Sequence, residues 1–289
     1  MLQQASSVVY LIGSLPASAE PSSGAPLLRD WLGTYDRQPD NVNGRPTYVQ
    51  RDFAHPKRVL WHSGDDWIVG PDWDVPKRRG WMNVRDAAIL PEKIRKEWAV
   101  GDGRLGWLAA PALRCDASDA ARAAAAASTA AYAEELRQAV PTVYLAGEAP
   151  GRMWKEWMGA YDWLDRDGQL VNGRHVYVQR GSEGQRMLWY TDGVYWRAGP
   201  AEQLGKQRGP LRALDGALLP EHVNAQWEAG DGGPEELWDE EETPGGWLPS
   251  PHLRCFGLEG GTTNDTAQIE LVRRWEVAAD GTTIERHVS

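Results

Sequence analysis

The chain has 289 residues, enough for two domains of ordinary size, and it contains 16 Trp against two Phe. Its formal charge of −10 is unevenly distributed, with +2 in residues 1–115 and −12 in residues 116–289. Because nucleic acids and anionic membranes attract basic surfaces, this charge argues against binding to either. No apolar run approaches the roughly 20 residues that a membrane-spanning helix needs, so we expect a soluble protein without membrane insertion.

A tandem duplication organises the sequence. Residues 43–51 read Asn-Gly-Arg-Pro-Thr-Tyr-Val-Gln-Arg, and residues 172–180, 129 positions later, read Asn-Gly-Arg-His-Val-Tyr-Val-Gln-Arg. Such self-similarity at a fixed spacing indicates repeated structural units. We expect four segments: a first Trp-rich β repeat over residues 1–115, an Ala-rich linker helix over 116–140, a second Trp-rich β repeat over 141–255 and a C-terminal hairpin extension over 256–289.

Each repeat is predicted to form a series of short antiparallel strands. The first repeat opens with an apolar strand at residues 9–11 and reaches Asn43-Gly44, a pair that suits a type I′ hairpin turn because it tolerates positive φ. Further β-branched and aromatic runs, broken by Gly, Pro and Asp, indicate a meander. Pro91, followed by acidic and then apolar residues, predicts one short helix within residues 86–100, and its counterpart lies within 215–229.

The linker and the C-terminal extension complete the predicted elements. Residues 116–140 include a run of alanines, with Ser118 placed to cap a helix and Pro141 just past its end, and the small side chains favour packing against one repeat. Asp280-Gly281 between alternating runs predicts a final hairpin. The expected fold class is therefore mainly β: two homologous small antiparallel β units, each a meander or partly open barrel with one short helix, joined by an Ala-rich helix.

The tryptophans divide into two groups. Five pairs recur in both repeats, and filling of a duplicated core is the simplest explanation for most of them. The indoles without a counterpart are better candidates for contact with a ligand or partner, and Trp238 also lies in an acidic segment, residues 234–243, that only the second repeat contains. The shared pairs are Trp31 with Trp157, Trp61 with Trp189, Trp67 with Trp196, Trp98 with Trp227, and Trp107 with Trp247; the candidates for contact are Trp73, Trp81, Trp154, Trp163 and Trp238, and Trp275 is also unshared.

An arginine follows each Asn-Gly turn. Arg45 and Arg174 occupy equivalent positions, and a guanidinium there can stack on an aromatic ring or pair with a carboxylate. An internal clamp is the first interpretation. The alternative is a ligand or partner contact that both repeats make, and both arginines are therefore candidate site residues.

Motifs for catalysis are lacking in the sequence. We find no nucleophile elbow, phosphate loop or dinucleotide fingerprint, and the six histidines show no metal-ligand spacing, so we predict no catalytic residue, no metal and no cofactor. The carboxylates of Asp65-Asp66 and Asp72-Trp73-Asp74 are better explained by a solvated loop face than by acid/base chemistry. Cys115 and Cys255 occupy equivalent positions, which favours two buried thiols over a disulfide and fits an intracellular compartment.

Two resemblances accompany these patterns. The succession Trp-x-Gly-x-Tyr, Asn-Gly-Arg-Pro-x-Tyr-Val, Leu-Trp and a final Gly-Trp resembles Trp-rich tandem repeats in predicted proteins of unicellular algae and other protists, which implies no settled activity. His175 departs from the pattern at the position of Pro46, which puts the shape of the second hairpin in question. Residues 246–251, Gly-Trp-Leu-Pro-Ser-Pro, resemble the closing strand of SH3 domains, and that resemblance implies recognition of a peptide.

Three functions from different classes remain open. The leading hypothesis is a non-enzymatic interaction or assembly protein, a scaffold with a protein partner, because small duplicated β units carry unshared tryptophans on predicted loops. The alternative is a carbohydrate-binding module that stacks a saccharide on exposed indoles and gains avidity from two units. A remote alternative is a glycoside-active enzyme that uses the loop aspartates named above.

Overall fold

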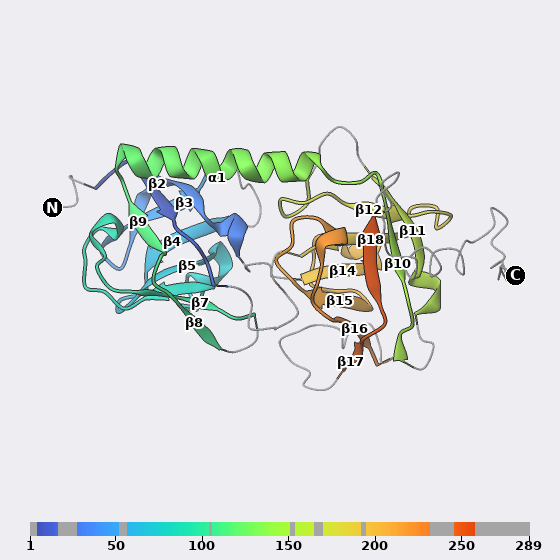
Figure 1. Ribbon diagram of the computed structural model, residues 1–289. Coiled ribbons are helices and arrows are strands. Elements are labelled where there is room, and N and C mark those ends of the chain that lie inside the picture. The colour runs from blue at the N-terminus through green and yellow to red at the C-terminus, as the bar shows by residue number, and fades with distance from the viewer. Residues whose placement is uncertain are drawn as a thin grey trace, which may run out of the picture. The chain divides into compact units, whose positions relative to one another are not determined.

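The structure is a computed structural model that describes residues 5–16, 28–51, 57–103, 106–150, 154–164, 170–191, 195–231 and 246–257. The chain divides into two compact units (Figure 1). The first unit comprises Met1–Ala19 with Gly24–Glu135, and the second comprises Glu20–Ser23 with Leu136–Ser289.

The first unit contains a nine-stranded antiparallel sheet. Its strands pair in the order β8-β7-β6-β5-β4-β3-β2-β1-β9, so that eight consecutive strands form a meander and the ninth returns to the far side of β1. The strands are β1 (Val8–Ile12), β2 (Gly33–Val42), β3 (Arg45–Gln50), β4 (Arg58–His62), β5 (Trp67–Pro71), β6 (Met82–Val84), β7 (Trp98–Gly101), β8 (Trp107–Ala110) and β9 (Arg114–Asp116).

The second unit repeats this architecture. Its sheet has the order β17-β16-β15-β14-β13-β12-β11-β10-β18, the same topology as in the first unit. The strands are β10 (Thr142–Ala146), β11 (Gly159–Trp163), β12 (Tyr177–Gln179), β13 (Arg186–Tyr190), β14 (Tyr195–Pro200), β15 (Leu211–Leu214), β16 (Trp227–Gly230), β17 (Trp247–Ser250) and β18 (Arg254–Gly257).

The connection between the two edge strands shows that each sheet is curled. In the first unit β8 and β9 lie at opposite ends of the pairing order, yet only residues 111–113 join them. A link of this length spans at most about 14 Å, so the two edges must approach each other. Residues 251–253 impose the same constraint on β17 and β18. The prediction of two mainly antiparallel β units is confirmed.

The Asn-Gly turns have the predicted conformation. Asn43 and Gly44 have φ values of 49° and 73°, and Asn172 and Gly173 have values of 51° and 78°, as a type I′ turn requires. In the first unit the turn joins β2 to β3 in register. In the second unit the flanking residues form only an isolated bridge, Val171 with Arg174, before β12 begins at Tyr177.

Shared tryptophans fill both cores, as predicted. Eight of the ten are buried, and these large rings supply much of the apolar area that each small unit removes from water. Trp107 is the exception in the first unit, with 49% of its surface exposed, and Trp247 in the second is partly exposed. The buried set is Trp31, Trp61, Trp67, Trp98, Trp157, Trp189, Trp196 and Trp227.

The Ala-rich segment forms the helix α1 (Asp119–Arg137), which packs against the first unit (Figure 1). Ala121 and Ala125 are buried against Ile12 at the end of β1. Ser118 caps the helix, because its Oγ accepts the Ala121 amide at 3.2 Å. Among the described residues, no helix combines the length and the apolar character that a membrane span requires.

The helix predicted within residues 86–100, and its counterpart within 215–229, are corrected by the structure. Each is a single 3-10 turn, η4 (Pro91–Lys93) or η8 (Pro220–His222), and the chain then extends into β7 or β16. The reason is that Asp86 Oδ2 accepts the amides of Arg95 and Lys96, which a continuing helix would have bonded to its own carbonyls. The other 3-10 turns are η2 (Arg29–Trp31), η3 (Asp72–Asp74), η6 (Lys155–Trp157) and η7 (Ala201–Gln203).

Two predicted features lie outside the described residues. The acidic segment at residues 234–243, including Trp238, falls between the described ranges 195–231 and 246–257. The predicted C-terminal hairpin extension, residues 256–289, is described only as far as Gly257, which ends β18.

Candidate functional site

The same polar frame holds the 3-10 turn at the start of β2 and of β11. Gln50 Nε2 donates to the carbonyls of Asp30 and Leu32 at 2.8 and 2.9 Å. Tyr35 adds a hydrogen bond from its hydroxyl to Trp31 O at 2.6 Å. In the second unit the equivalent Gln179 and Tyr161 make the same bonds to the turn η6. The frame therefore fixes the same backbone conformation twice.

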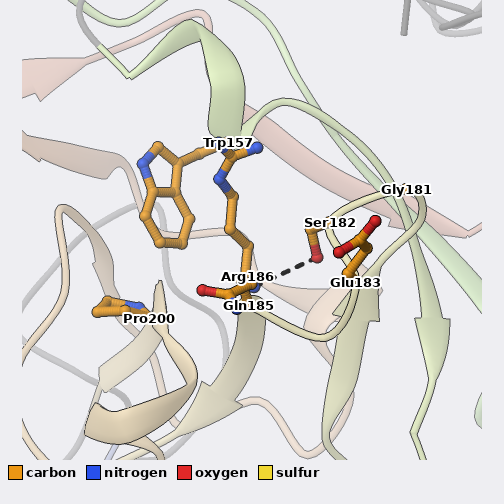
Figure 2. Close-up of a pocket in the computed structure, with 7 residues that line it drawn as sticks. All are labelled: Trp157, Gly181, Ser182, Glu183, Gln185, Arg186 and Pro200. Carbon is orange, nitrogen blue, oxygen red and sulfur yellow. Dashed lines mark hydrogen bonds between the residues drawn. The ribbon is translucent and has the colours of Figure 1, made fainter. Parts of the chain in front are cut away.

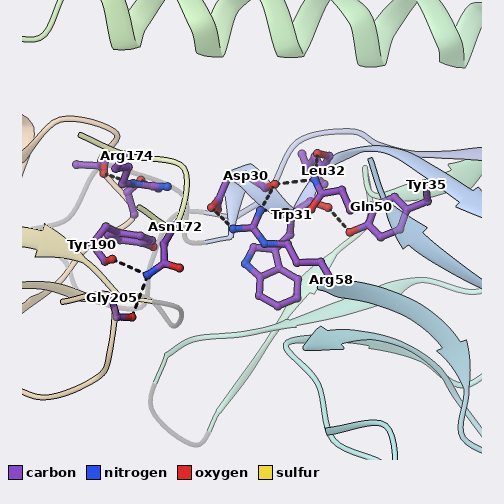
Figure 3. Close-up of polar contacts among 12 residues, drawn as sticks. Asp30, Trp31, Leu32, Tyr35, Gln50, Arg58, Asn172, Arg174, Tyr190 and Gly205 are labelled. Carbon is purple, nitrogen blue, oxygen red and sulfur yellow. Dashed lines mark hydrogen bonds and ion pairs between the residues drawn. The ribbon is translucent and has the colours of Figure 1, made fainter. Parts of the chain in front are cut away.

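In the first unit this frame encloses an ion pair. Arg58 Nη2 lies 2.5 Å from Asp30 Oδ2, and the two side chains are 3% and 1% exposed. Arg58 Nη1 also donates to the Asp30 carbonyl, and the guanidinium lies over the Trp31 ring at 4.8 Å from its centroid (Figure 3). The cation is thus neutralised and covered by its own chain.

In the second unit the equivalent arginine keeps the frame but lacks the carboxylate. Arg186 Nη1 donates to the carbonyl of Glu156 at 2.9 Å and to Gln179 Oε1 at 3.2 Å. Its guanidinium lies 5.6 Å from the Trp157 ring centroid. Within the described part of the chain, no carboxylate pairs with Arg186, and its Nε and Nη2 have no hydrogen-bond partner. The arginine is therefore buried in an ion pair in the first unit, whereas in the second unit it is left without a carboxylate partner among the described residues.

Arg186 lines a surface pocket of about 390 Å³. Figure 2 shows the Trp157 indole beside the arginine, with the loop of Ser182 and Glu183 on the other side of it. Gln179 holds the backbone of the turn that carries Trp157, because its Nε2 donates to the carbonyls of Glu156 and Met158, both at 2.8 Å. The pocket combines a cation, an indole and a hydroxyl, which is the mixture of polar and apolar groups found in ligand sites.

Burial keeps Tyr161 and the two cysteines in their neutral forms. Burial raises the pKa of Tyr161 far above its usual value, so its hydroxyl stays protonated and donates to Trp157 O at 2.7 Å. Burial likewise raises the pKa of the Cys115 and Cys255 thiols well above the usual range. Both are free and buried, as predicted, and neither carries the thiolate that a nucleophile needs.

The two turn arginines bond within their own units. Arg45 Nη1 donates to the carbonyl of Ala88, which also accepts the Trp67 indole N–H at 2.9 Å. Arg174 is 1% exposed, donates from Nε to Ala217 O at 3.1 Å and lies 3.6 Å from the Tyr190 ring centroid (Figure 3). These bonds are what an internal clamp requires.

The candidate tryptophans are dispersed through the fold. Trp73 in η3 is 41% exposed, and Trp81 is partly buried beside Gly101. In the second unit Trp154 donates its indole N–H to Gly230 O at 2.8 Å, and Trp163 packs edge-on against His175 with centroids 4.1 Å apart. The burial of His175 lowers its pKa. Among the described residues, no contact brings these indoles to one common site, and Trp238 lies outside the described residues.

The loop carboxylates do not form a described metal cluster. Asp74 pairs with Lys77 at 3.2 Å, and both Asp72 and Asp74 lie in the turn η3, which has no buried residue. Within the described ranges, no three His, Cys, Asp or Glu side chains come together in a way that could hold a metal ion.

The sequence prediction missed Arg58, Arg186 and the role of Trp157. The signal was present, because aligning the two Leu-Trp pairs places Arg58 opposite Arg186, and aligning Trp31 with Trp157 places Asp30 opposite Glu156. The arginine is the same in both units but the acidic residue differs, which indicates that the arginine forms different ion pairs in the two units. Searches of family models, curated proteins and solved structures found no match to this chain.

Proposed function

We propose that this chain is a non-enzymatic interaction protein whose second unit binds a partner at the Arg186 pocket. One observation supports this proposal above the others. The two units keep the same hydrogen-bonded frame, but the first covers its arginine with Asp30, whereas Arg186 faces a surface pocket. Exposure of this arginine in only one of the two units creates a surface for recognition there, while the hydrogen-bonded frame is kept in both.

The chemistry of the pocket suits contact with another protein. Arginine and tryptophan are enriched among the residues that dominate binding energy in protein interfaces. Trp157 is 8% exposed, so its ring is held by the core and presents an edge at little entropic cost. The hydrogen bonds from Arg186 Nη1 similarly restrain the guanidinium before a partner arrives.

Affinity capture from the native host lysate tests this proposal. The wild-type chain and the variant Arg186→Glu are used as baits, and captured proteins are quantified by mass spectrometry. Arg254→Glu is the matched control, because it makes the same charge change at an exposed position of the same unit. We expect a stoichiometric partner that is captured by the wild type and the control but lost with Arg186→Glu. The absence of any enriched protein would argue against an interaction function.

A carbohydrate-binding function is the second candidate, and exposed indoles in the first unit favour it. Trp73 and Trp107 are 41% and 49% exposed, and the solvent-accessible part of an indole is a surface on which sugars stack. Trp107 is uncovered because Asn83 stands where the second unit has Arg212, whose guanidinium lies 4.0 Å from the Trp247 ring centroid.

Saccharide titrations followed by tryptophan fluorescence test this second candidate. Trp107→Ala should abolish the fluorescence response to a saccharide identified on a glycan array. Ile89→Ala is the control, because Ile89 is also an exposed apolar residue of the same unit, at 41%. Flat titrations with the wild-type chain across the array would remove the carbohydrate hypothesis.

A further inference from the structure

We infer that the Arg186 pocket is a carboxylate-binding site, filled by an acidic side chain of the partner. This inference rests on the proposed function and specifies the chemistry of the bound group. In the first unit the equivalent arginine, Arg58, already holds the carboxylate of Asp30.

Asp30 shows how a carboxylate occupies this frame. Its Oδ2 lies 2.5 Å from Arg58 Nη2, while Arg58 Nη1 is held by a backbone carbonyl and by Gln50 Oε1 at 3.3 Å. In the second unit Nη1 of Arg186 is held by the same two kinds of acceptor. The donor that Asp30 satisfies in the first unit is therefore the donor that a ligand would satisfy in the second.

Glu156 occupies the position of Asp30 but does not fill this role. Its side chain is exposed, and its only described bond to Arg186 uses the backbone carbonyl. Asp30, which is one methylene shorter, reaches the guanidinium directly from the equivalent turn. Arg186 is consequently a restrained cation without an internal counter-ion among the described residues.

The remaining donors fit a planar carboxylate. Nε and Nη2 of arginine form one edge of the guanidinium fork, and a carboxylate can accept both bonds in parallel. Ser182 Oγ donates to Gln179 O at 2.9 Å and accepts the Arg186 amide at 3.3 Å, so the hydroxyl holds the loop and the guanidinium is the donor left for an anion. Trp157 and Pro200 supply apolar walls for the atoms that carry the carboxylate.

The charge of the pocket favours a carboxylate over a phosphate. Glu183 also lines the pocket and is exposed on the loop after β12. Its negative charge offsets that of Arg186, so the pocket has no net positive charge to compensate for taking a phosphate with nearly two charges out of water, whereas a single carboxylate loses less hydration. One arginine facing one acidic residue therefore selects an anion of low charge.

A peptide titration observed by NMR tests this inference on the full chain. The probe is the acetylated and amidated peptide Gly-Trp-Asp-Gly, and the readout is the side-chain Nε–H signal of Arg186, assigned from its disappearance in Arg186→Lys. We expect a saturable shift of this signal. The peptide with Asn in place of Asp should bind about tenfold or more weakly, because charge-assisted hydrogen bonds are about twice as strong as neutral ones.

Two variants distinguish recognition from a loss of folding. Arg186→Gln should weaken peptide binding about tenfold or more, since it removes the guanidinium group that donates to the carboxylate. Glu156→Asp is the sharper test, because it keeps both the net charge and Arg186 but recreates the internal carboxylate of the first unit. In this variant the carboxylate introduced at position 156 should compete with the peptide for Arg186 and weaken peptide binding to a similar degree. The backbone amide spectrum should stay that of the folded chain.

The outcomes separate this inference from the proposed function. Equal binding of the Asp and Asn peptides, tighter binding of inorganic phosphate than of acetate, or no effect of Glu156→Asp would each overturn the carboxylate site. A lysate partner that persists with Arg186→Gln would leave an interaction protein without this site. Saturable peptide binding without any lysate partner would support the site and argue against the interaction function.

Discussion

The exchange of Asp30 for Glu156 changes a buried ion pair into an open cation. Removing one partner of a buried pair leaves a charge that neither water nor protein neutralises, which typically costs about 3–5 kcal/mol. Asp30→Asn should therefore lower the free energy of unfolding of the first unit by about that amount. The matched change Glu156→Gln should stay within about 0.5 kcal/mol, because the Glu156 side chain is exposed. Urea denaturation of the two variants measures this difference.

This comparison has a clear opposite outcome. Equal losses in Asp30→Asn and Glu156→Gln would mean that Glu156 pairs with Arg186 in solution, and the open pocket would then be absent. A small loss in both would mean that solvent reaches Arg58, contrary to its 3% exposure.

A buried histidine makes the first unit sensitive to acid. His62 is 1% exposed, and its Nδ1 accepts the Gly64 amide at 3.1 Å. Burial, and then the charge of Arg45, lower the pKa of His62 below its ordinary value of 6.5. The unfolded chain therefore binds the proton more readily, so stability should be present above about pH 6.5 and should fall as the pH drops towards the lowered pKa.

The second unit supplies the variant that tests this pH dependence. Tyr190 occupies the position of His62 and packs edge-on against Trp196, with centroids 5.7 Å apart. His62→Tyr should therefore reduce the loss of unfolding free energy of the first unit between pH 7.5 and 5.5. Denaturant titrations at both pH values measure it. An unchanged loss in the variant would assign the acid sensitivity to other groups.

At the scale of elements, the closing of each curled sheet depends on a glycine after the first strand. Gly13 has φ +131°, and a Cβ there would lie 2.0 Å from the Ala112 carbonyl oxygen, which belongs to the link between β8 and β9. Gly64 has a similar φ of +115°, but a Cβ there would meet nothing within 4 Å. Substitutions at Gly13 and Gly64 therefore distinguish the cost of backbone strain alone from the cost of strain together with a steric clash.

We predict that Gly64→Ala costs about 1–3 kcal/mol, the cost of the strained φ alone. Gly13→Ala should cost more than that, because the backbone of the closing link must also move. Thermal unfolding followed by near-UV circular dichroism measures both. Similar losses in the two variants would show that the sheet edges are not held together at Gly13.

Local chemistry explains which elements the sequence could predict. The Asn43-Gly44 turn, the capped alanine helix and the alternating strands follow from short-range preferences, and the structure has all three. The helix expected after Pro91 failed because Asp86, several residues earlier, takes the amides that would have continued it. Local sequence patterns do not indicate hydrogen bonds between residues that are separated by several positions in the chain.

The candidate site was harder to predict for the same reason. Arg45 and Arg174 stood out because they follow a recognisable turn, whereas Arg58 and Arg186 follow loops of different length. The site arises where a 3-10 turn, a glutamine on one strand and an arginine on the next meet, as in Glu156, Gln179 and Arg186. The sequence offers only the change from Asp to Glu as a clue.

At the scale of the whole molecule, the described residues of each unit form a nine-stranded sheet with its own set of buried tryptophans. A unit that satisfies its own strand pairing and buries its own core has what it needs for a cooperative transition. Most of the helix α1 belongs to the first unit, where Ala121 and Ala125 are buried, and its last two residues, Leu136 and Arg137, belong to the second. The duplication should therefore be visible in the thermodynamics as well as in the topology.

We predict that the intact chain unfolds in two transitions and that variants of one unit shift only one of them. Asp30→Asn should lower the melting temperature of the first unit by about 10 °C or more, given its expected cost and the size of the unit. Gly147→Ala should move only the other transition, because a Cβ at Gly147 would lie 2.0 Å from His252 O in the second unit. Differential scanning calorimetry of the two variants and of their combination measures this. If either variant displaced both transitions together, the units would be one cooperative body, and changes at Arg186 would have to be interpreted as changes to the entire chain.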